Sequence, residues 1–542
     1  MGEDTARILR IKRMWRANWP MNEERKLEKR GSEAGAALLI AIFALLLISV
    51  VAIALVVSQG TDSALTGNYR TSTSAYYAGI AGLEEGRGRL LLKNANYLNI
   101  TGSFPGLFTS GGAPTFGLTD VLYIINPAGG ETVDPTSGPY ADNEYFTEFG
   151  SAPSSPKIVN SVFPVAGLPG PLYKWVRITP ATEQSLSPPL GIDVNGDGYI
   201  DYATPLNYDP ANQAANGTLQ PGLIVESTPP TTAGEALEVT ALAVLPNNTQ
   251  KLVQYLVAPL YYGVNNPIPA ALVLVGSGVT ATPGLSFKVP LTAASPSFQI
   301  SGNDGTGPNS AAPGCAPSAP QIWAIGTTDV VVPEGNALSN YYTIRNAIPS
   351  ALEGNYSGAI PPPHHHLSLG DNTPLSPVMM TPASLSSMVQ TISQNADLVL
   401  NRNASDSDMP TAMSATNPMT VVVNGNLTLN NFTGYGLLVV TGNFVSNPNA
   451  GWRGMVLVVG AGDVIFAGGP GGGNGEYDGG IFVAQTLDTT VSPPNPLTTM
   501  GTATFNALNA GGNGIFYNSC WINAALQPPS FQVLSFREIP TN

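Results

Sequence analysis

The chain has 542 residues, and only 11% of them are charged, well below the usual quarter. Residues 1–30 carry nine basic and five acidic side chains, whereas the rest carries 13 basic and 31 acidic ones, a net charge of −18. Such an acidic body offers no attraction to phosphate backbones, so nucleic-acid-binding proteins are excluded as a class. The length predicts a membrane segment followed by two or three folded units.

Residues 34–57 form a run of 24 positions without a charged side chain. As a helix rising about 1.5 Å per residue, the run reaches roughly 36 Å, which exceeds a hydrocarbon core of about 30 Å. A basic segment at residues 25–31 precedes it. Under the positive-inside rule, residues 1–33 stay cytoplasmic as a basic leader and the bulk becomes periplasmic or extracellular. The alternative is a cleaved secretory signal, which has a shorter apolar core of about 7–15 residues and an A-x-A-like site.

The helical pattern continues beyond this run, so we predict one membrane-spanning and protein-packed helix over residues 34–95. Apolar side chains recur every seven residues at Tyr69, Tyr76, Leu83 and Leu90. A second row holds the small residues Ala78, Gly82 and Gly86, which lets another element approach closely. The alternative is a frayed helix end in which the glycines mark loops.

Two motifs within residues 35–92 suggest a family. The apolar helix is followed by Gly-Asn-Tyr-Arg at residues 67–70 and by an alanine-rich segment that ends in Gly-Leu-Glu at residues 82–84. The segment resembles the N-terminal region of PilX-like proteins of type IV pilus assembly. This resemblance covers about 65 residues and implies a minor-pilin-like protein. Its expected partners are the membrane and other pilin-like subunits or pilus assembly proteins.

The sequence departs from the pilin pattern at the processing site. Pilin precursors are cut after a glycine and carry a glutamate at the fifth position of the mature chain. A cut after Gly31 makes Ser32 the first residue and Ala36 the fifth, and a cut after Gly35 makes Ala36 the first. Neither register places Glu33 at the fifth position, so a cleaved pilin-like subunit and a permanently anchored assembly factor both remain open.

Residues 96–345 read as a β-rich, pilin-head-like domain of the α+β type. Residues 236–245 and 251–257 predict two strands around a polar turn, and residues 174–178 predict another strand. Packed behind the long helix, these strands would form a helix-on-sheet unit.

A candidate calcium loop lies within this domain at residues 193–201. It offers hard oxygen ligands at the spacing of a calcium loop, with a glycine at the sharp-turn position. The proposed ligands are Asp193, Asn195, Asp197, Asp201 and the carbonyl of Tyr199, with Asp209 as an additional closing ligand. Position 12 is Thr204 and not glutamate, which disfavours a full EF-hand. The alternative is a metal-free turn between strands.

A sequence repeat predicts a small β-solenoid over residues 411–542, after a linker at residues 346–410. Val422–Leu427 is matched by Val439–Phe444 and, with one inserted residue, by Val458–Val464. Residues 481–484 would begin a fourth copy. A period near 20 residues favours stacked β-coils over the alternative, a meander of hairpins. In the linker, residues 381–400 show an N-cap, a proline in the first turn and apolar spacing, which predict a helix.

Other motifs are weaker. Residues 472–478 are interpreted as a glycine-rich corner, because their calcium-like motif occurs once and its aspartate comes one place late. His364, His365 and His366 are interpreted as a flexible loop, since adjacent side chains of an extended chain cannot all reach one ion. The two cysteines, Cys315 and Cys520, form either a disulfide or two separate buried thiols.

The expected fold is therefore mainly β, with a long N-terminal transmembrane helix, an α+β middle unit and a C-terminal solenoid-like unit. We expect a structural role without catalysis, in a surface appendage or in adhesion. The alternative is an anchored enzyme or adhesin acting on surface polysaccharide. Asp406, Asp408 and Asp463 could supply its acids, although nothing in the sequence places a pair at the roughly 5–10 Å that glycoside cleavage uses.

Overall fold

The computed structural model describes most of the chain after the basic leader. The described residues are 33–91, 94, 96, 98, 120–150, 153, 156–163, 170–188, 190–202, 204–210, 222–225, 234–264, 268–276, 285–289, 298–328, 340–359, 367–370, 373–467, 475–508, 510, 514–527 and 530–540. By internal contacts, the residues up to Thr71 form one unit and those from Ser72 onward form another.

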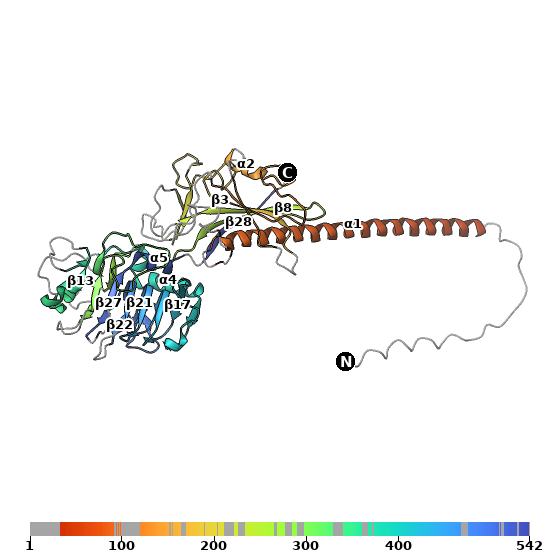
Figure 1. The fold of residues 1–542 in the computed structure, drawn as a ribbon. Coiled ribbons are helices and arrows are strands. Elements are labelled where there is room, and N and C mark those ends of the chain that lie inside the picture. The colour runs from red at the N-terminus through yellow and green to blue at the C-terminus, as the bar shows by residue number, and fades with distance from the viewer. Residues whose placement is uncertain are drawn as a thin grey trace, which may run out of the picture. The chain divides into compact units, whose positions relative to one another are not determined.

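The first element, α1, is a helix of 57 residues from Glu33 to Arg89 (Figure 1). Its large apolar side chains between Leu38 and Val57 are all exposed, by 49–72%. The helix is long and apolar enough to span a membrane. The helix ends six residues before the predicted end. Near its last turn the side-chain amide of Asn94 donates a hydrogen bond to the backbone carbonyl of Gly88 at 3.0 Å.

The last turns of α1 pack on an antiparallel sheet through the row of small residues. Ala78 and Leu83 are buried in the core that α1 shares with this sheet. A Cβ atom added to Gly82 would lie 3.0–3.2 Å from side chains of the sheet, and one added to Gly86 would lie 2.8 Å from Val176. The small residues therefore allow the helix to approach the sheet of its own head. From the sequence alone, the same row of small residues could equally have served the approach of another helix.

This sheet has six strands in the order β2-β1-β3-β7-β8-β28, and the β1–β2 pair alone is parallel. The strands are β1 Leu122–Ile125, β2 Lys157–Asn160, β3 Tyr173–Pro180, β7 Leu237–Val244, β8 Gln250–Pro259 and β28 Phe531–Ile539. The predicted hairpin is confirmed, since Leu237 pairs with Val257. We call this sheet, with the end of α1, the head.

A short helix packs on the opposite face of the head sheet. α2 (Asn143–Phe149) begins at Asp142, whose side chain accepts the Tyr145 amide. Tyr145 of α2 packs with Tyr123 and Trp175 of the sheet. The next residues along these strands, Ile124 and Val176, face α1 on the other side, because successive side chains of a strand point to opposite faces. The turn η1 (Gly138–Tyr140) precedes α2, and a three-stranded sheet formed by β4 (Leu206–Asp209), β5 (Gly222–Val225) and β6 (Gly234–Glu235) follows β3.

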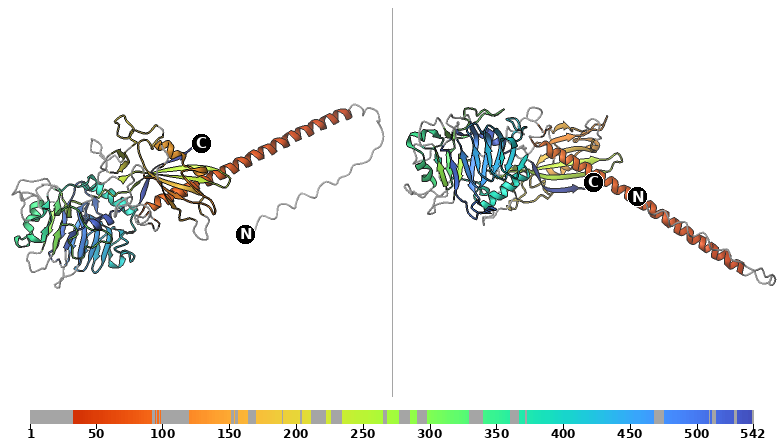
Figure 2. Two further views of the ribbon diagram at one scale, coloured as in Figure 1. Left: turned by 45° about the horizontal axis from the view of Figure 1, so that its top comes forward. Right: turned by 90° about the horizontal axis from the view of Figure 1, so that it is seen from below.

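Most of the remaining chain forms two parallel sheets. The larger sheet has eleven strands: β9 Ala270–Val275, β11 Gln299–Ser301, β12 Trp323–Thr327, β13 Tyr356–Ser357, β14 Leu369–Gly370, β15 Leu398–Leu400, β17 Met419–Val423, β19 Thr433–Val440, β21 Gly451–Gly460, β23 Glu476–Gln485 and β27 Gly514–Tyr517. The smaller has six: β10 Leu285–Lys288, β16 Ala404–Ser405, β18 Leu427–Leu429, β20 Phe444–Ser446, β22 Asp463–Phe466 and β26 Ala503–Asn506. Figure 2 shows the green strands of the middle of the chain beside the blue strands of its end.

From β15 to β22 the chain alternates between the two sheets, which explains the repeat. Val422 pairs with Val439, and Leu427 pairs with Phe444, as the first two copies predict. In the third copy Val458 pairs with Val440, one residue away from the predicted match. The corner before β22 therefore absorbs two extra residues and not one.

The sheets divide the chain differently from the predicted ranges. Strands β9 to β14 lie within predicted residues 96–345 and 346–410 but pair in the parallel sheets, whereas β28 belongs to the head. The parallel sheets are thus an insertion between β8 and β28 of the head sheet. Such long-range pairing leaves no local periodicity in the sequence, which is why the sequence missed it.

Short helices and turns complete these sheets. They are α3 Asn340–Ala347, η2 Ser350–Asn355, η3 Pro377–Met379, α4 Pro382–Gln394, η4 Asp406–Asp408, α5 Ser519–Ala525 and the small hairpin of β24 (Leu487–Asp488) and β25 (Asn495–Pro496). α4 starts at the predicted Thr381 cap but ends at Gln394, because the last residues of the predicted helix, Leu398–Leu400, form β15. α5 packs on β19, β21 and β23.

Candidate functional site

The candidate calcium loop lies between β3 and β4 and is fixed by one buried carboxylate. Glu183 is fully buried. Its two oxygens accept the amides of Val194 and Asp201, each at 2.7 Å. Its carbonyl accepts the amide of Ile192 at 2.9 Å. Both ends of the loop are therefore held by a residue that the sequence analysis did not single out.

The loop's own side chains turn toward its backbone. Asp193 accepts the amides of Gly196 and Gly198 at 2.6 and 2.8 Å, and Asp197 accepts the amide of Tyr199 at 2.8 Å. Asn195 donates to Asp197 at 3.1 Å. Each carboxylate oxygen keeps a second lone pair, so these residues retain the hard oxygen donors that calcium prefers.

The side chains do not converge on a preformed ion site. Among the described residues, no group of three or more His, Cys, Asp or Glu side chains lies close enough to hold a metal ion. Asp209 is buried at the end of β4, and the side chain of Tyr199 points to solvent with 77% exposure. Calcium binding therefore stays a prediction from the loop's donor set.

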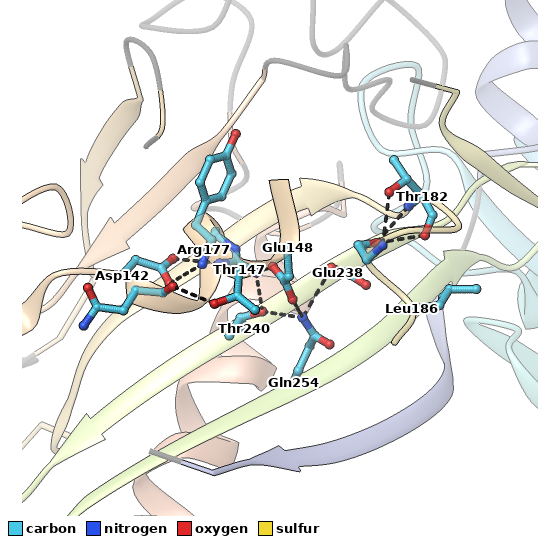
Figure 3. A network of polar contacts seen from close by, with 12 residues as sticks. Asp142, Thr147, Glu148, Arg177, Thr182, Leu186, Glu238, Thr240 and Gln254 are labelled. Atoms are coloured by element: carbon cyan, nitrogen blue, oxygen red, sulfur yellow. Dashed lines mark hydrogen bonds and ion pairs between the residues drawn. The ribbon is translucent and has the colours of Figure 1, made fainter. Parts of the chain in front are cut away.

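The head contains a buried network of charges between α2 and the sheet (Figure 3). Arg177 is fully buried and pairs with Asp142 at 2.8 Å and with Glu148. Gln254 donates to Glu148 at 3.0 Å, and Arg537 of β28 donates to the same carboxylate at 2.9 Å. The network thus ties α2, β3 and β8 to the last strand of the chain.

At Glu238 and Arg177 of this network, burial and the neighbouring charges act on the pKa in opposite directions. Burial raises the pKa of Glu238 to about 7, although Arg177 and Arg537 oppose the shift. Burial alone would lower the pKa of Arg177, but the carboxylate of Asp142 and other acidic neighbours hold it above its ordinary value. These groups are enclosed and bonded to one another, so we assign them to stability and not to catalysis.

A second buried pair of carboxyl groups lies on β23 in the larger parallel sheet. Glu476 accepts the backbone amide of Asn309 at 2.9 Å and its side-chain amide at 2.7 Å. Asp478 is fully buried with its carboxyl group 3.4 Å from Arg453, and within the described part of the chain no hydrogen-bond partner reaches either of its oxygens. Burial and Glu476 raise the pKa of Asp478 to about 8.

The surroundings of this pair show that it is closed off. A Cβ atom added to Gly307 would lie 2.4–2.5 Å from oxygens of Asp478 and Glu476, so backbone covers both carboxyl groups. The prediction of a glycine-rich corner at residues 472–478 is wrong for residues 476–478, because β23 begins at Glu476. The strand places Glu476 and Asp478 on one face, which is the alternation that could have identified the pair.

Two of the three aspartates considered for polysaccharide cleavage are bonded to neighbouring residues. Asp406 accepts the amides of Asn430 and Asn431 at 2.8 and 3.0 Å, and Asp408 pairs with Arg402 at 2.6 Å. Asp463 lies on β22, three strands from β16 in the smaller sheet. At about 4.8 Å per strand, β16 and β22 are roughly 14 Å apart. This spacing is larger than the separation of two carboxyl groups in glycoside cleavage.

The two cysteines form a disulfide. Cys315 and Cys520 are 5.9 Å apart between their Cα atoms and are joined by an S–S bond, so the chain segment before β12 is tied to α5. Asp304 strengthens the same attachment by accepting the amide and hydroxyl of Ser519 at 2.8 and 2.6 Å.

A cleft of about 680 Å³ lies along the end of α1. It is lined by Ala81, Glu84, Glu85, Arg89, Asn94, Asn96, Val162, Phe163, Gly170 and Pro171. Glu85 accepts Ser161 at 2.8 Å and pairs with Arg89 at 3.4 Å, while Glu84 pairs with Arg87 at 2.5 Å. The charged groups of the cleft are therefore satisfied within the protein.

The predicted processing residues fall at the start of α1. Gly35 and Ala36 lie in its first turns, whereas Gly31 and Ser32 lie outside the described residues. His364, His365 and His366 also lie outside them.

Comparisons of the chain with protein-family models, curated proteins and solved structures find no match. The resemblance to PilX-like proteins therefore remains a prediction from residues 35–92.

Proposed function

We propose that the chain is a membrane-anchored, minor-pilin-like structural protein of a type IV pilus or a related surface appendage. One observation carries the proposal. In α1, the large apolar side chains between Leu38 and Val57 are exposed, whereas Ala78, Gly82 and Gly86 of the same helix are buried against the head sheet. An apolar surface of that length requires lipid or apolar helices of other subunits around it.

The orientation follows from the charges of the sequence. The basic leader at residues 1–30 precedes the apolar run, so the N-terminus stays in the cytoplasm and the acidic β-rich body is exported. Partners are the membrane and other pilin-like subunits. We also propose that the two inserted parallel sheets form a small β-solenoid.

Membrane fractionation tests the anchor. In the full-length chain, the double substitution Leu46→Arg/Ile53→Arg places two charges in the apolar run, each costing about 2.5–3.5 kcal/mol at the centre of a membrane helix. The control Leu190→Arg alters a side chain that is 81% exposed in the head. We expect the wild type and the control to stay with the membranes and the double variant to be released.

The same preparation yields the mature N-terminus. A start at Ser32 or Ala36 supports pilin-type processing, whereas an intact Met1 supports a permanent anchor. Recovery of the wild-type chain in the soluble fraction without detergent would overturn the anchored model in either form.

We also propose that residues 193–201 bind calcium weakly, with a dissociation constant of roughly 10⁻⁴–10⁻³ M, and that the ion stiffens the loop. Calorimetric titration of calcium into the full-length protein tests this. Asp193→Asn/Asp197→Asn should abolish the heat of binding. The control Asp488→Asn alters another aspartate that accepts an amide two residues ahead, Thr490 at 2.9 Å, and should not change the heat of binding. Equal heats for both variants would reject the site.

A further inference from the structure

The loop between β3 and β4 exposes four large apolar side chains. They are Leu190 (81% exposed), Ile192 (48%), Tyr199 (77%) and Tyr202 (71%), and we call them the apolar loop surface. A tyrosine side chain presents 150–250 Å², so the two rings alone expose roughly 300 Å². The largest apolar patch of a soluble monomer is typically about 300–600 Å² and is often functional, so these side chains are a candidate interaction surface.

The backbone below this surface is held in one conformation. Glu183 binds the amides of Val194 and Asp201, as described above. The side chain of Ile200 lies against Gly191, where a Cβ atom would be only 2.5 Å from its Cγ2. Gly191 and Ile200 thus meet beneath the loop, and their neighbours Leu190, Ile192 and Tyr199 face solvent. A rigid loop binds a partner with little loss of conformational entropy.

The charge around the surface specifies the partner. Between Arg177 and Lys251 the sequence contains no lysine, arginine or histidine but eight acidic residues, of which Glu183, Asp209, Glu235 and Glu238 are buried. Asp193, Asp197 and Asp201 lie in the loop itself, among its apolar side chains. This field repels anionic lipids, anionic glycans and acidic proteins, and it attracts cations. Tyrosine rings add cation–π attraction, which favours arginine above all.

We propose that the apolar loop surface binds a basic segment of another protein, in which arginine or lysine alternates with apolar residues. In the calcium-free loop, arginine side chains would lie over Tyr199 and Tyr202 and pair with the loop carboxylates, so that calcium competes with this partner. The apolar residues of the partner would cover Leu190 and Ile192. Tyrosine and arginine are also the residues that dominate the energy of protein interfaces. The basic leader of the same chain is not the ligand if, as proposed above, it lies across the membrane.

Fluorescence anisotropy with the full-length protein in nanodiscs of neutral phosphatidylcholine tests the proposal. The probes are labelled 12-residue peptides, one of alternating Arg and Leu and one of alternating Glu and Leu, in EGTA so that calcium does not contribute. The variant is Tyr199→Ala/Tyr202→Ala. The matched control is Tyr69→Ala on α1, because Tyr69 is 71% exposed, like Tyr202. Hydrogen exchange in β3 and β4 verifies that each variant is folded.

We expect the Arg/Leu peptide to bind the wild type and the control equally and the double variant at least tenfold more weakly. Binding should weaken as salt rises, and the Glu/Leu peptide should not bind. Equal binding to wild type and double variant would overturn the proposal, since general attraction to an acidic protein would then suffice. So would tyrosine-dependent, salt-independent binding of a neutral oligosaccharide such as chitohexaose, which would make the loop a glycan surface. Both outcomes compare variants in the same nanodiscs, so they are distinguishable from a failure of membrane anchoring, which the fractionation experiment tests separately.

Discussion

The contact between α1 and the head sheet predicts opposite effects for two glycines in the same helix. Replacing glycine with alanine inside a helix stabilises it by up to about 1 kcal/mol. At Gly86, the new methyl group would lie 2.8 Å from Val176 Cγ1 and 2.9 Å from Val239 Cγ1. Both neighbours are β-branched residues on strands and cannot swing aside. At Gly88, the one described atom within 4 Å of the new methyl group is the side-chain nitrogen of Asn94, at 3.4 Å, which is an ordinary van der Waals distance.

Overpacking a core costs about 1–3 kcal/mol, so Gly86→Ala should destabilise the head by about 1 kcal/mol after the helical gain is included. Gly88→Ala should leave stability unchanged or raise it by up to about 1 kcal/mol. The two variants then differ by about 1–2 kcal/mol, which is roughly 5- to 30-fold in the equilibrium for opening the sheet.

Native-state hydrogen exchange of the full-length protein, measured on peptides that cover β3 and β7, reads this local stability. Exchange should be faster than in the wild type for Gly86→Ala and not for Gly88→Ala. If Gly86→Ala slows exchange as much as Gly88→Ala does, the helix does not meet the sheet at Gly86. The small-residue row would then be free for another helix.

Three further predictions concern the buried charges and the disulfide. Burial raises the pKa of Asp478 to about 8, so the folded protein keeps a proton that the unfolded chain loses near pH 4. The free energy of unfolding should therefore fall as the pH rises from about 4 to 8. Asp478→Asn should remove this fall, so the urea midpoint of the variant should exceed that of the wild type by more at pH 9 than at pH 5. Arg177→Met leaves buried carboxylates without their partner and should cost about 3–5 kcal/mol in urea unfolding of the head, whereas Lys157→Met, at a pair about 30% exposed, should cost less than about 1 kcal/mol. Cys315→Ser/Cys520→Ser opens a link spanning 205 residues and should lower the thermal midpoint, with a loss of up to about 5 kcal/mol; a reductant should reproduce the shift in the wild type and leave the variant unchanged.

Local patterns predicted the elements whose causes are local. The apolar run marked α1, the polar turn marked the hairpin of β7 and β8, and Thr381 marked the start of α4. The repeat predicted the pairing of Val422 with Val439, because both residues come just before the corner that leads to the smaller sheet. The third copy slipped by one residue, since the glycines of its corner do not reveal how many residues the turn absorbs.

Pairings over long distances could not be predicted in the same way. Nothing near β9 shows that it lies beside β23, about 200 residues later. The candidate calcium residues at 193–201 share one loop because they are close in the sequence, whereas Asp209 lies on β4. Glu183, which fixes that loop, lies ten residues before Asp193 and resembles an ordinary surface acid in the sequence. Its burial depends on backbone amides of residues 194 and 201, which only the folded loop brings to it.

The last strand explains how two different β-structures are joined in one chain. Phe531 of β28 is buried in the core shared by α1 and the head sheet, and its carbonyl accepts Arg87 of α1 at 2.9 Å. Arg537 of the same strand binds Glu148, the carboxylate that also pairs with buried Arg177. Without β28 the strand β8 would become an unpaired edge, and the buried charges would lose one cation. The head sheet is therefore completed only after the inserted sheets have been synthesised, and truncation before Phe531 would remove a part of the head and not of the parallel sheets.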